Sequence, residues 1–174
     1  MSKDIFSINE DEIMNFYNFG GFSGKIKLRI KLLNSWILHS LAYHSIYSPL
    51  TISLQRKRGI KIKENSHIAP YVIFDLIFPH LIEIHENVSI GSNTMIFSHS
   101  NPTANPILKE KYYPRKIAQV VIKKGAWINP GCIIGPGVTI GENSVLSVGT
   151  VVTTSVPDNC VVAGNPGRLV KKLD

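Results

Sequence analysis

Apolar residues recur at every sixth position through the C-terminal third of the chain. The series consists of Ile122, Ile128, Ile134, Ile140, Leu146 and Val152. Four places after each member comes a residue of modest size: Ala126, Cys132, Val138, Ser144, Thr150 and Val156. Gly, Asn and Pro fill many of the intervening positions, so each unit predicts a short strand followed by a turn. One unit cannot bury its aliphatic residue alone, and the pattern therefore predicts a solenoid of stacked units with a continuous apolar interior.

The same six-residue count is present earlier in the chain, with two interruptions. Its first members are Ile62, Ile68 and Phe74, and after a break at residues 75–80 it resumes as Ile84, Ile90 and Ile96. The 26 residues from Ile96 to Ile122 are one unit of six plus 20 extra residues. Long insertions without their own periodicity are uncommon in compact domains and are often functional. We predict an inserted loop at residues 102–121, projecting from the solenoid with His99 at its base.

The first 61 residues lack the six-residue count, and we predict that they form a helical segment that precedes the solenoid, here called the lead-in. A short helix is expected around residues 10–17, and residues 25–48 carry helically spaced apolar side chains, namely Ile26, Ile30, Leu33, Ile37 and Leu41. A basic amphipathic helix of this kind packs on its own domain or a partner subunit, or lies peripherally on a membrane surface. The predicted organisation is a lead-in at 1–61, a β-solenoid at 62–164 and a C-terminal tail at 165–174.

Composition is that of an ordinary soluble chain: 174 residues, 44% hydrophobic and 18% charged. No apolar run is long enough to span a bilayer, and the polar first four residues are unlike a secretory signal, so a cytoplasmic location is expected. Cys132 falls on an interior position of the repeat and Cys160 lies just beyond it. Both are predicted to be packed thiols rather than a disulfide.

The formal net charge of +7 is concentrated in the N-terminal part, where residues 1–61 carry nine basic and four acidic groups. Such an excess suits a solvated or membrane-facing surface, or a site for a phosphorylated ligand. No recognisable nucleic-acid motif accompanies these residues, so nucleic acid is not expected as a partner. The basic run at residues 56–58, before Gly59, is interpreted as a solvated turn.

Several segments resemble the hexapeptide-repeat acyltransferases, and among them the sugar and polysaccharide O-acetyltransferases related to the galactoside and maltose acetyltransferases. They are residues 121–128, 134–145, 152–157 and 163–168, the last reading Ala-Gly-Asn-Pro-Gly-Arg. The resemblance covers about residues 60–172. It implies a mainly β fold, a left-handed parallel β-helix with three hexapeptides per turn. It also implies a homotrimer with an acyl-CoA site between neighbouring prisms and a long loop embracing the next subunit.

Acetyl transfer from a thioester requires a base for the acceptor and stabilisation of the developing oxyanion, without a covalent intermediate on the enzyme. In the resembling enzymes a His at the start of the long loop is the base, and His99 matches that position in the polysaccharide-modifying branch. The alternative is a loop histidine that merely bonds to the backbone. In the galactoside branch the His stands where this chain has Asn101.

For the donor acetyl-CoA, the resemblance points to five residues: Trp127, Val148, Thr153, Arg168 and Lys171. Basic side chains suit the nucleotide phosphates. Alternatively, Trp127 is an ordinary packing residue and the C-terminal cations only solubilise the chain. The family usually has Gly where this chain has Asn129, and a Gly-Ala-Gly-Ser run where it has Ser147 and Val148.

The expected acceptor is a saccharide hydroxyl, with Asp75, His80 and Asn101 as candidate acceptor-binding residues because of their positions at the two interruptions. An antibiotic hydroxyl, as in the streptogramin acetyltransferases of the same fold, and a sugar amine remain open.

Two further classes compete with this interpretation. The spacing of His80 and His85 is similar to one zinc-ligand pair of the γ-class carbonic anhydrases, but the residues around them do not complete that site, and no metal is expected. A trimeric β-helix used only as a scaffold is the third hypothesis.

Overall fold

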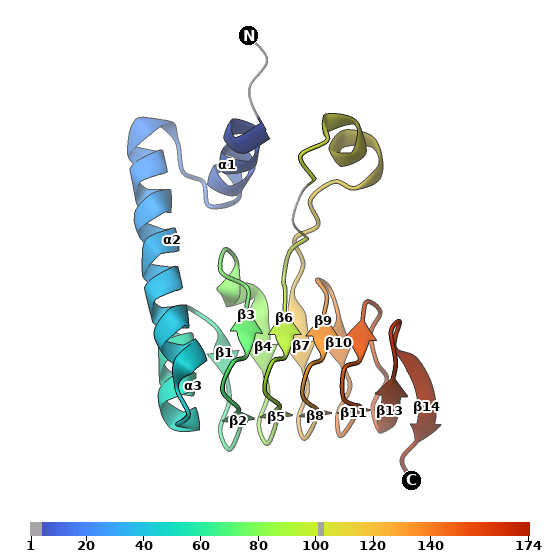
Figure 1. Cartoon of the computed structure of the whole chain (residues 1–174). Coiled ribbons are helices and arrows are strands. Elements are labelled where there is room, and N and C mark those ends of the chain that lie inside the picture. Colours follow the sequence, from blue (N-terminus) through green and yellow to red (C-terminus); the bar gives the residue numbers. More distant parts are fainter. Residues whose placement is uncertain (1–4, 101–102) are drawn as a thin grey trace.

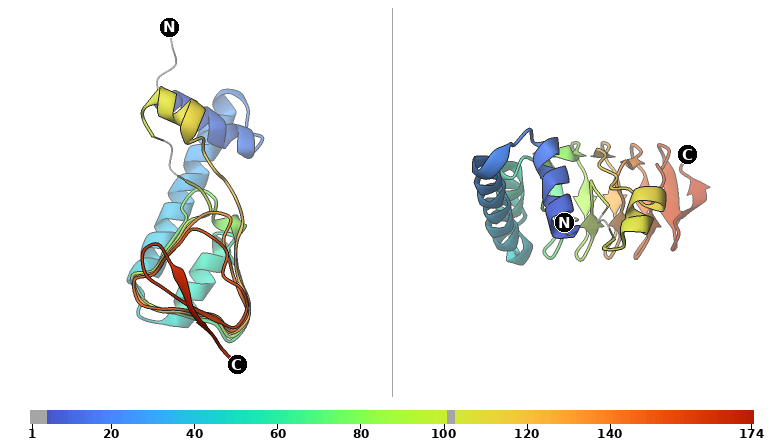
Figure 2. Two further views of the ribbon diagram at one scale, coloured as in Figure 1. Left: turned by 90° about the vertical axis from the view of Figure 1, so that its right-hand side faces the viewer. Right: turned by 90° about the horizontal axis from the view of Figure 1, so that it is seen from above.

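The six-residue units wind into a triangular prism with one sheet on each side, whose strands are parallel except for β14 (Arg168–Lys172) (Figures 1 and 2). The computed structural model describes residues 5–100 and 103–174. The first sheet contains β1 (Lys61–Ile62), β4 (Ile82–Ile84), β7 (Val120–Ile122) and β10 (Thr139–Ile140). The second contains β2 (His67–Ile68), β5 (Ser89–Ile90), β8 (Trp127–Ile128), β11 (Val145–Leu146), β13 (Cys160–Ala163) and β14 (Arg168–Lys172). The third contains β3 (Ile73–Phe74), β6 (Met95–Ile96), β9 (Ile133–Ile134) and β12 (Val151–Val152).

The register confirms the predicted repeat. Each aliphatic residue pairs with its equivalent in the next coil, for example Ile84 with Ile122 and Ile96 with Ile134. The four side chains in these two pairs are 0% exposed, and the aliphatic residues of the repeat form one continuous core along the prism. Cys132 and Cys160 are buried free thiols within that core, as expected.

The third residue after most of these aliphatic positions has a left-handed backbone conformation, with φ between 52° and 81°. This conformation is what Gly and Asn tolerate best, which explains their recurrence in the repeat. The residues concerned are Asn65, Tyr71, Asn87, Asn93, Gly125, Gly131, Gly137, Asn143 and Gly149. Ile77, His99 and Ser155 hold the same place after β3, β6 and β12 without this conformation, and after β3 and β6 the chain leaves the prism.

Three helices precede the prism: α1 (Ile5–Phe16), α2 (Gly21–His44) and α3 (Ser48–Lys57). Helix α3 packs against β1 and β2, and α2 packs on α3 across the end of the prism (Figure 1). The buried residues of α2 are Gly24, Leu28, Ser35, His39 and Ala42. The helically spaced apolar set of residues 25–48 is exposed, so it does not pack on this chain's own domain, and its contact with a partner subunit or a membrane stays a prediction. No helix in the described ranges is both long and apolar enough to cross a bilayer.

The two interruptions have different structures. Between β3 and β4 the chain forms a short 3₁₀ turn, η1 (Pro79–Leu81). Between β6 and β7 it rises from the prism as an arm carrying a π-helical turn, η2 (Leu108–Tyr112), beside α1 (Figures 1 and 2). Backbone bonds from Ser100 N–H to Lys116 O and from Ala118 N–H to Ser98 O join the two strands of this arm at its base. At the opposite end, β14 pairs antiparallel with β13 and closes the prism.

Candidate functional site

Both interruptions begin at the same corner of the prism. Asp75 follows β3 and His99 follows β6 closely, and these strands are neighbours in the third sheet with Phe74 opposite Ile96. Parallel pairing therefore brings the two departing segments side by side. Residues that are far apart along the chain meet at the foot of the arm.

The imidazole of His99 and the carboxylate of Asp75 form a close pair. Nδ1 of His99 lies 2.5 Å from Oδ2 of Asp75. Because an ionised carboxylate only accepts hydrogen bonds, Nδ1 carries the proton and the lone pair is on Nε2. The His99 side chain is 6% exposed and that of Asp75 is 0% exposed, so the pair is shielded from bulk water. This tautomer is the one required of a general base.

The backbone holds the Asp75 carboxylate in place. Oδ1 accepts from the N–H groups of Ile77 and Phe78, and Oδ2 accepts from the N–H groups of Ser98 and His99. Burial alone would raise the pKa of Asp75, but the bond from His99 and the backbone N–H groups outweigh it and keep the pKa below its usual value. Asp75 thus lies behind His99, and its predicted contact with the acceptor stays a prediction.

Aromatic rings surround this pair on the side of α1. Phe78 meets His99 edge-on with 5.3 Å between centroids, and Tyr17 stacks on Phe78 at 5.8 Å. His80 packs against Tyr17 at 5.7 Å, and burial lowers the pKa of His80. Contacts therefore run from His80 through two rings to His99. His80 was predicted to bind the acceptor, which stays a prediction. Asn101, the third predicted acceptor residue, lies outside the described residues.

A buried arginine supports Asp75 from the helical side. The Arg58 guanidinium donates to the backbone oxygen of Asp75 at 2.6 Å and to Oγ of Ser35 at 3.1 Å. It also faces Gln55 and Nδ1 of His39 on α2. Arg58 is 7% exposed, so its interpretation as part of a solvated turn was wrong. No signal in the sequence distinguishes it from its neighbours Arg56 and Lys57, both of which are exposed.

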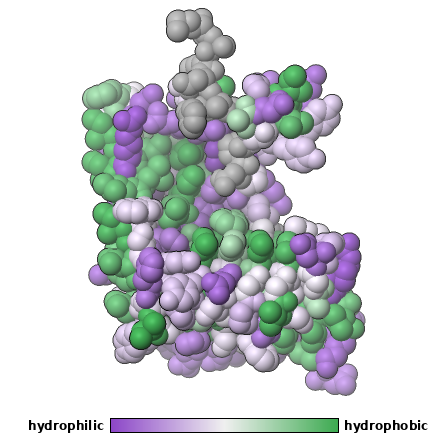
Figure 3. All heavy atoms as spheres, viewed as in Figure 1, coloured by the Kyte–Doolittle hydropathy of each residue, from purple (hydrophilic) through white to green (hydrophobic). Residues whose placement is uncertain are grey.

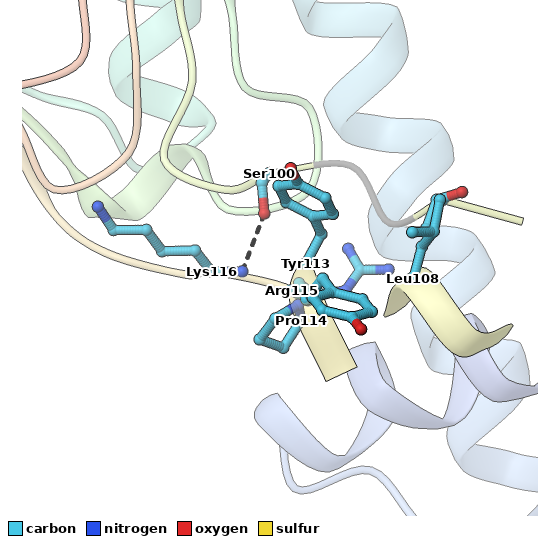
Figure 4. A pocket seen from close by; sticks show the side chains of 8 residues that line it. Ser100, Leu108, Tyr113, Pro114, Arg115 and Lys116 are labelled. Carbon is cyan, nitrogen blue, oxygen red and sulfur yellow. Dashed lines mark hydrogen bonds between the residues drawn. The ribbon is translucent and has the colours of Figure 1, made fainter. Parts of the chain in front are cut away.

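The arm holds a second charged cluster and a pocket. Lys109 and Arg115, with side chains 7% and 6% exposed, both pair with Glu12 of α1 at 2.8 and 3.0 Å. Next to this cluster lies a pocket of about 790 Å³ (Figure 4). Its lining consists of Ser100, Thr103, Leu108, Tyr112, Tyr113, Pro114, Arg115 and Lys116. Ser100, which directly follows His99 in the chain, lines the pocket, whereas His99 itself does not.

The residues predicted to bind the donor lie on the outside of the late coils. Trp127, Val148, Thr153, Arg168 and Lys171 are all exposed. Thr153 follows β12, two strands along the third sheet from β6, so it lies on the same corner as His99. Arg168 lines a shallow pocket with Thr154, in the turn after β12. Trp127 and Lys171 belong to the second sheet. The single chain therefore does not gather the five into one pocket.

The histidines considered for a metal have other partners. Nε2 of His85 lies 3.1 Å from Oε1 of Glu83, and Nδ1 of His80 lies 3.5 Å from the hydroxyl of Tyr17. Among residues 5–100 and 103–174, no three His, Cys, Asp or Glu side chains gather as a metal site would require. The chemistry that the Asp75–His99 pair offers is proton transfer and hydrogen bonding.

Comparisons with known proteins agree with the prism. Residues 119–154 match the family described as bacterial transferase hexapeptide (six repeats). YvoF of Bacillus subtilis (strain 168), provisionally described as an acetyltransferase, is 31% identical over 142 residues, covering 81% of this chain and 77% of that protein. Galactoside O-acetyltransferase of Escherichia coli (strain K12) is 33% identical over 117 residues, covering 63% of this chain and 55% of the relative.

A solved structure is also similar. The galactoside acetyltransferase in complex with coenzyme A aligns with a TM-score of 0.62 at 26% identity, covering 84% of this chain and 82% of that one.

Proposed function

The chain belongs to the hexapeptide-repeat acetyltransferases, its prism being their left-handed parallel β-helix, and from this premise we propose that it transfers acetyl from acetyl-CoA to a saccharide hydroxyl with His99 as base. The Asp75–His99 pair is the observation that carries the proposal. It places a histidine of the right tautomer at the foot of the arm, where the two interruptions of the repeat meet.

The proposed reaction is a direct transfer. Nε2 of His99 takes the proton from the acceptor hydroxyl as its oxygen attacks the thioester carbonyl carbon. The tetrahedral intermediate then collapses, the carbon–sulfur bond breaks, and the departing sulfur receives the proton from the imidazolium. Asp75 stays ionised throughout and stabilises the positive charge that His99 carries between these two proton transfers.

Donor binding is proposed to involve two chains of a homotrimer. Trp127 and Val148 are 54% and 71% exposed, so the single chain leaves these large apolar side chains uncovered. A groove between neighbouring prisms would bury them against pantetheine and leave Arg168 and Lys171 near the phosphates. The arm stands away from the prism and leaves a recess beneath it, which gives a neighbouring prism room (Figure 3).

The pocket of the arm supports a saccharide acceptor. Tyr112 and Tyr113 provide apolar ring surfaces against which a sugar ring can pack, and Ser100 adds a hydroxyl to the lining. The Lys116 side chain points away from the other labelled residues (Figure 4). We propose that an acceptor held by this pocket extends past Ser100 and brings one hydroxyl to Nε2 of His99. The predicted roles of His80 and Asn101 at this acceptor site remain part of the proposal.

The test is a thiol-release assay with acetyl-CoA against a panel of sugars, nucleotide-linked sugars, amino sugars and hydroxylated antibiotics. We expect release with at least one saccharide, and a loss of at least about a hundredfold for His99→Ala, the usual contribution of a general base. His67→Ala is the matched control, because His67 is an exposed residue of β2 on another side of the prism.

Two results would overturn the proposal. One is full activity of the folded His99→Ala protein. The other is acetylation of only antibiotics or amines across the panel, which would replace the saccharide hydroxyl as acceptor. Acetyl-CoA binding, followed by calorimetry, is expected to persist in His99→Ala, because the base acts on the acceptor proton.

A further inference from the structure

Helix α2 presents a row of large apolar side chains to solvent along its whole length. We call it the outer stripe: Phe22, Ile26, Ile30, Leu33, Ile37 and Leu41, between 44% and 80% exposed. Their spacing of three and four residues places them on one face at 3.6 residues per turn. The residues that α2 buries in the chain lie on the opposite face. An uninterrupted apolar face of this length on a protein surface indicates an interaction site.

The outer stripe faces directly away from the prism. Helix α2 crosses the N-terminal end of the prism, with α3 and the first coil on its inner side (Figures 1 and 2). In the space-filling view, apolar side chains line the edge of the molecule formed by α2 (Figure 3). The stripe therefore forms part of an end surface and not of a side that carries the sheets.

The charge around the stripe identifies its occupant. Between Glu12 and Glu64 the chain has no acidic residue and nine basic residues. Lys27 and Arg29, both exposed, fall on either side of the stripe, and Arg29 is only loosely paired with Glu10 at 3.5 Å. Two copies meeting through this face would bring like charges together. An anionic lipid surface instead offers opposite charge to the cations and an apolar layer to the stripe.

Exposed aromatic residues at the same end fit this occupant. Trp36 of α2 and Tyr47, at the start of α3, are 55% and 64% exposed. Trp and Tyr side chains favour the boundary between lipid headgroups and acyl chains, because their rings are apolar with one polar atom. Aliphatic, aromatic and basic side chains thus occur together in the pattern of a helix that lies in a membrane surface.

We propose that the outer stripe of α2 docks this protein on an anionic phospholipid membrane, with the helix parallel to the bilayer plane. In the proposed trimer, three prisms packed side by side around a threefold axis would direct all three stripes the same way, which multiplies a weak single contact. The Asp75–His99 pair lies on the first two coils, so docking holds the site close to the lipid surface. Acceptor saccharides attached to lipid would then be within reach.

The test is flotation of the full chain with phosphatidylcholine vesicles, with and without phosphatidylglycerol. We expect binding only with phosphatidylglycerol, weakened by high salt. Ile30→Gln/Leu33→Gln should reduce the bound fraction at least about tenfold, and Lys27→Gln/Arg29→Gln about fivefold or more. The matched control is Leu169→Gln/Val170→Gln, which removes two equally exposed aliphatic side chains from β14 at the other end of the prism.

Several outcomes would contradict docking. The first is no binding to either vesicle, and the second is unchanged binding of the folded stripe variant. A third is a sedimentation mass twice that of the proposed trimer, which falls to the trimer mass in the Ile30→Gln/Leu33→Gln variant. That result would assign the stripe to contact with a second copy. Acetyl transfer to a water-soluble acceptor should be the same in the stripe variant and the unchanged protein, so failure of docking is distinguishable from failure of the proposed reaction.

Discussion

Asp75 and His99 are separated by 24 positions in the chain, yet Oδ2 of Asp75 lies 2.5 Å from Nδ1 of His99. The pairing of β3 with β6 creates this relationship, because each residue leaves the third sheet at an interruption of the repeat. The backbone N–H groups that bind the carboxylate come from both departing segments. The Asp75–His99 pair is thus held in place by the two departing segments that it joins.

Replacing Asp75 by Asn should lower kcat about a hundredfold or more, with little change in KM for acetyl-CoA. The amide removes the negative charge that stabilises imidazolium and can present an N–H group to Nδ1. Steady-state kinetics with circular dichroism would check this. Asp158→Asn is the control, since Asp158 is an exposed carboxylate paired with Lys123. Unchanged kcat in folded Asp75→Asn would exclude a role for Asp75 in positioning the base.

Replacing Arg58 by Met should destabilise the fold by about 3–5 kcal/mol, the usual cost of breaking a buried charged network. The variant leaves the backbone oxygen of Asp75 and the Ser35 hydroxyl without this donor. Denaturant unfolding measures the change. Lys57→Met serves as control because Lys57 is exposed one position earlier, and a loss of equal size there would contradict a specific role of the buried guanidinium.

Acidification should destabilise the helical end of the molecule through His39. Burial, aided by the Arg58 charge, lowers the pKa of His39 from 6.5 to about 4. The unfolded chain therefore binds a proton between these values that the folded chain does not, so stability is lost as pH falls from 6.5 to 4. The loss is at most about 3 kcal/mol. Urea unfolding across this range is the measurement, and His39→Gln should flatten the pH dependence whereas exposed His44→Gln should not.

Replacing Glu12 by Ala should loosen the arm. Lys109 and Arg115 both pair with Glu12, and these bonds keep the pKa of Glu12 low although burial opposes them. Without the carboxylate, the two nearly buried cations lose their shared partner. Local opening of the arm away from α1 then becomes easier. Trypsin should cleave the arm about tenfold faster. Glu110→Ala, an exposed carboxylate of the same arm, is the control, and equal rates in both variants would refute the connection to α1.

The sequence by itself determined the solenoid and its interruptions, and the family resemblance implied its three-sided form. A spacing of six, with small residues four places on and Gly or Asn three places on, specifies which side chains are buried and where the backbone turns, because each unit is local and repeats. It also indicated His99, since an unpatterned insertion next to a histidine stands out against a regular count. The family resemblance then supplied the handedness, which periodicity cannot.

Only the tertiary structure decided what surrounds that histidine and which face of α2 is buried. The partner of His99 depends on the pairing of two coils, and Arg58 reaches Asp75 only because α3 packs on the first coil. For α2, helical periodicity identified an apolar face but not its direction. The structure buries the side with Ser35 and His39, because Arg58 and Gln55 satisfy these polar groups, and turns the outer stripe to the outside. Long-range polar pairing of this kind leaves no local pattern in a sequence.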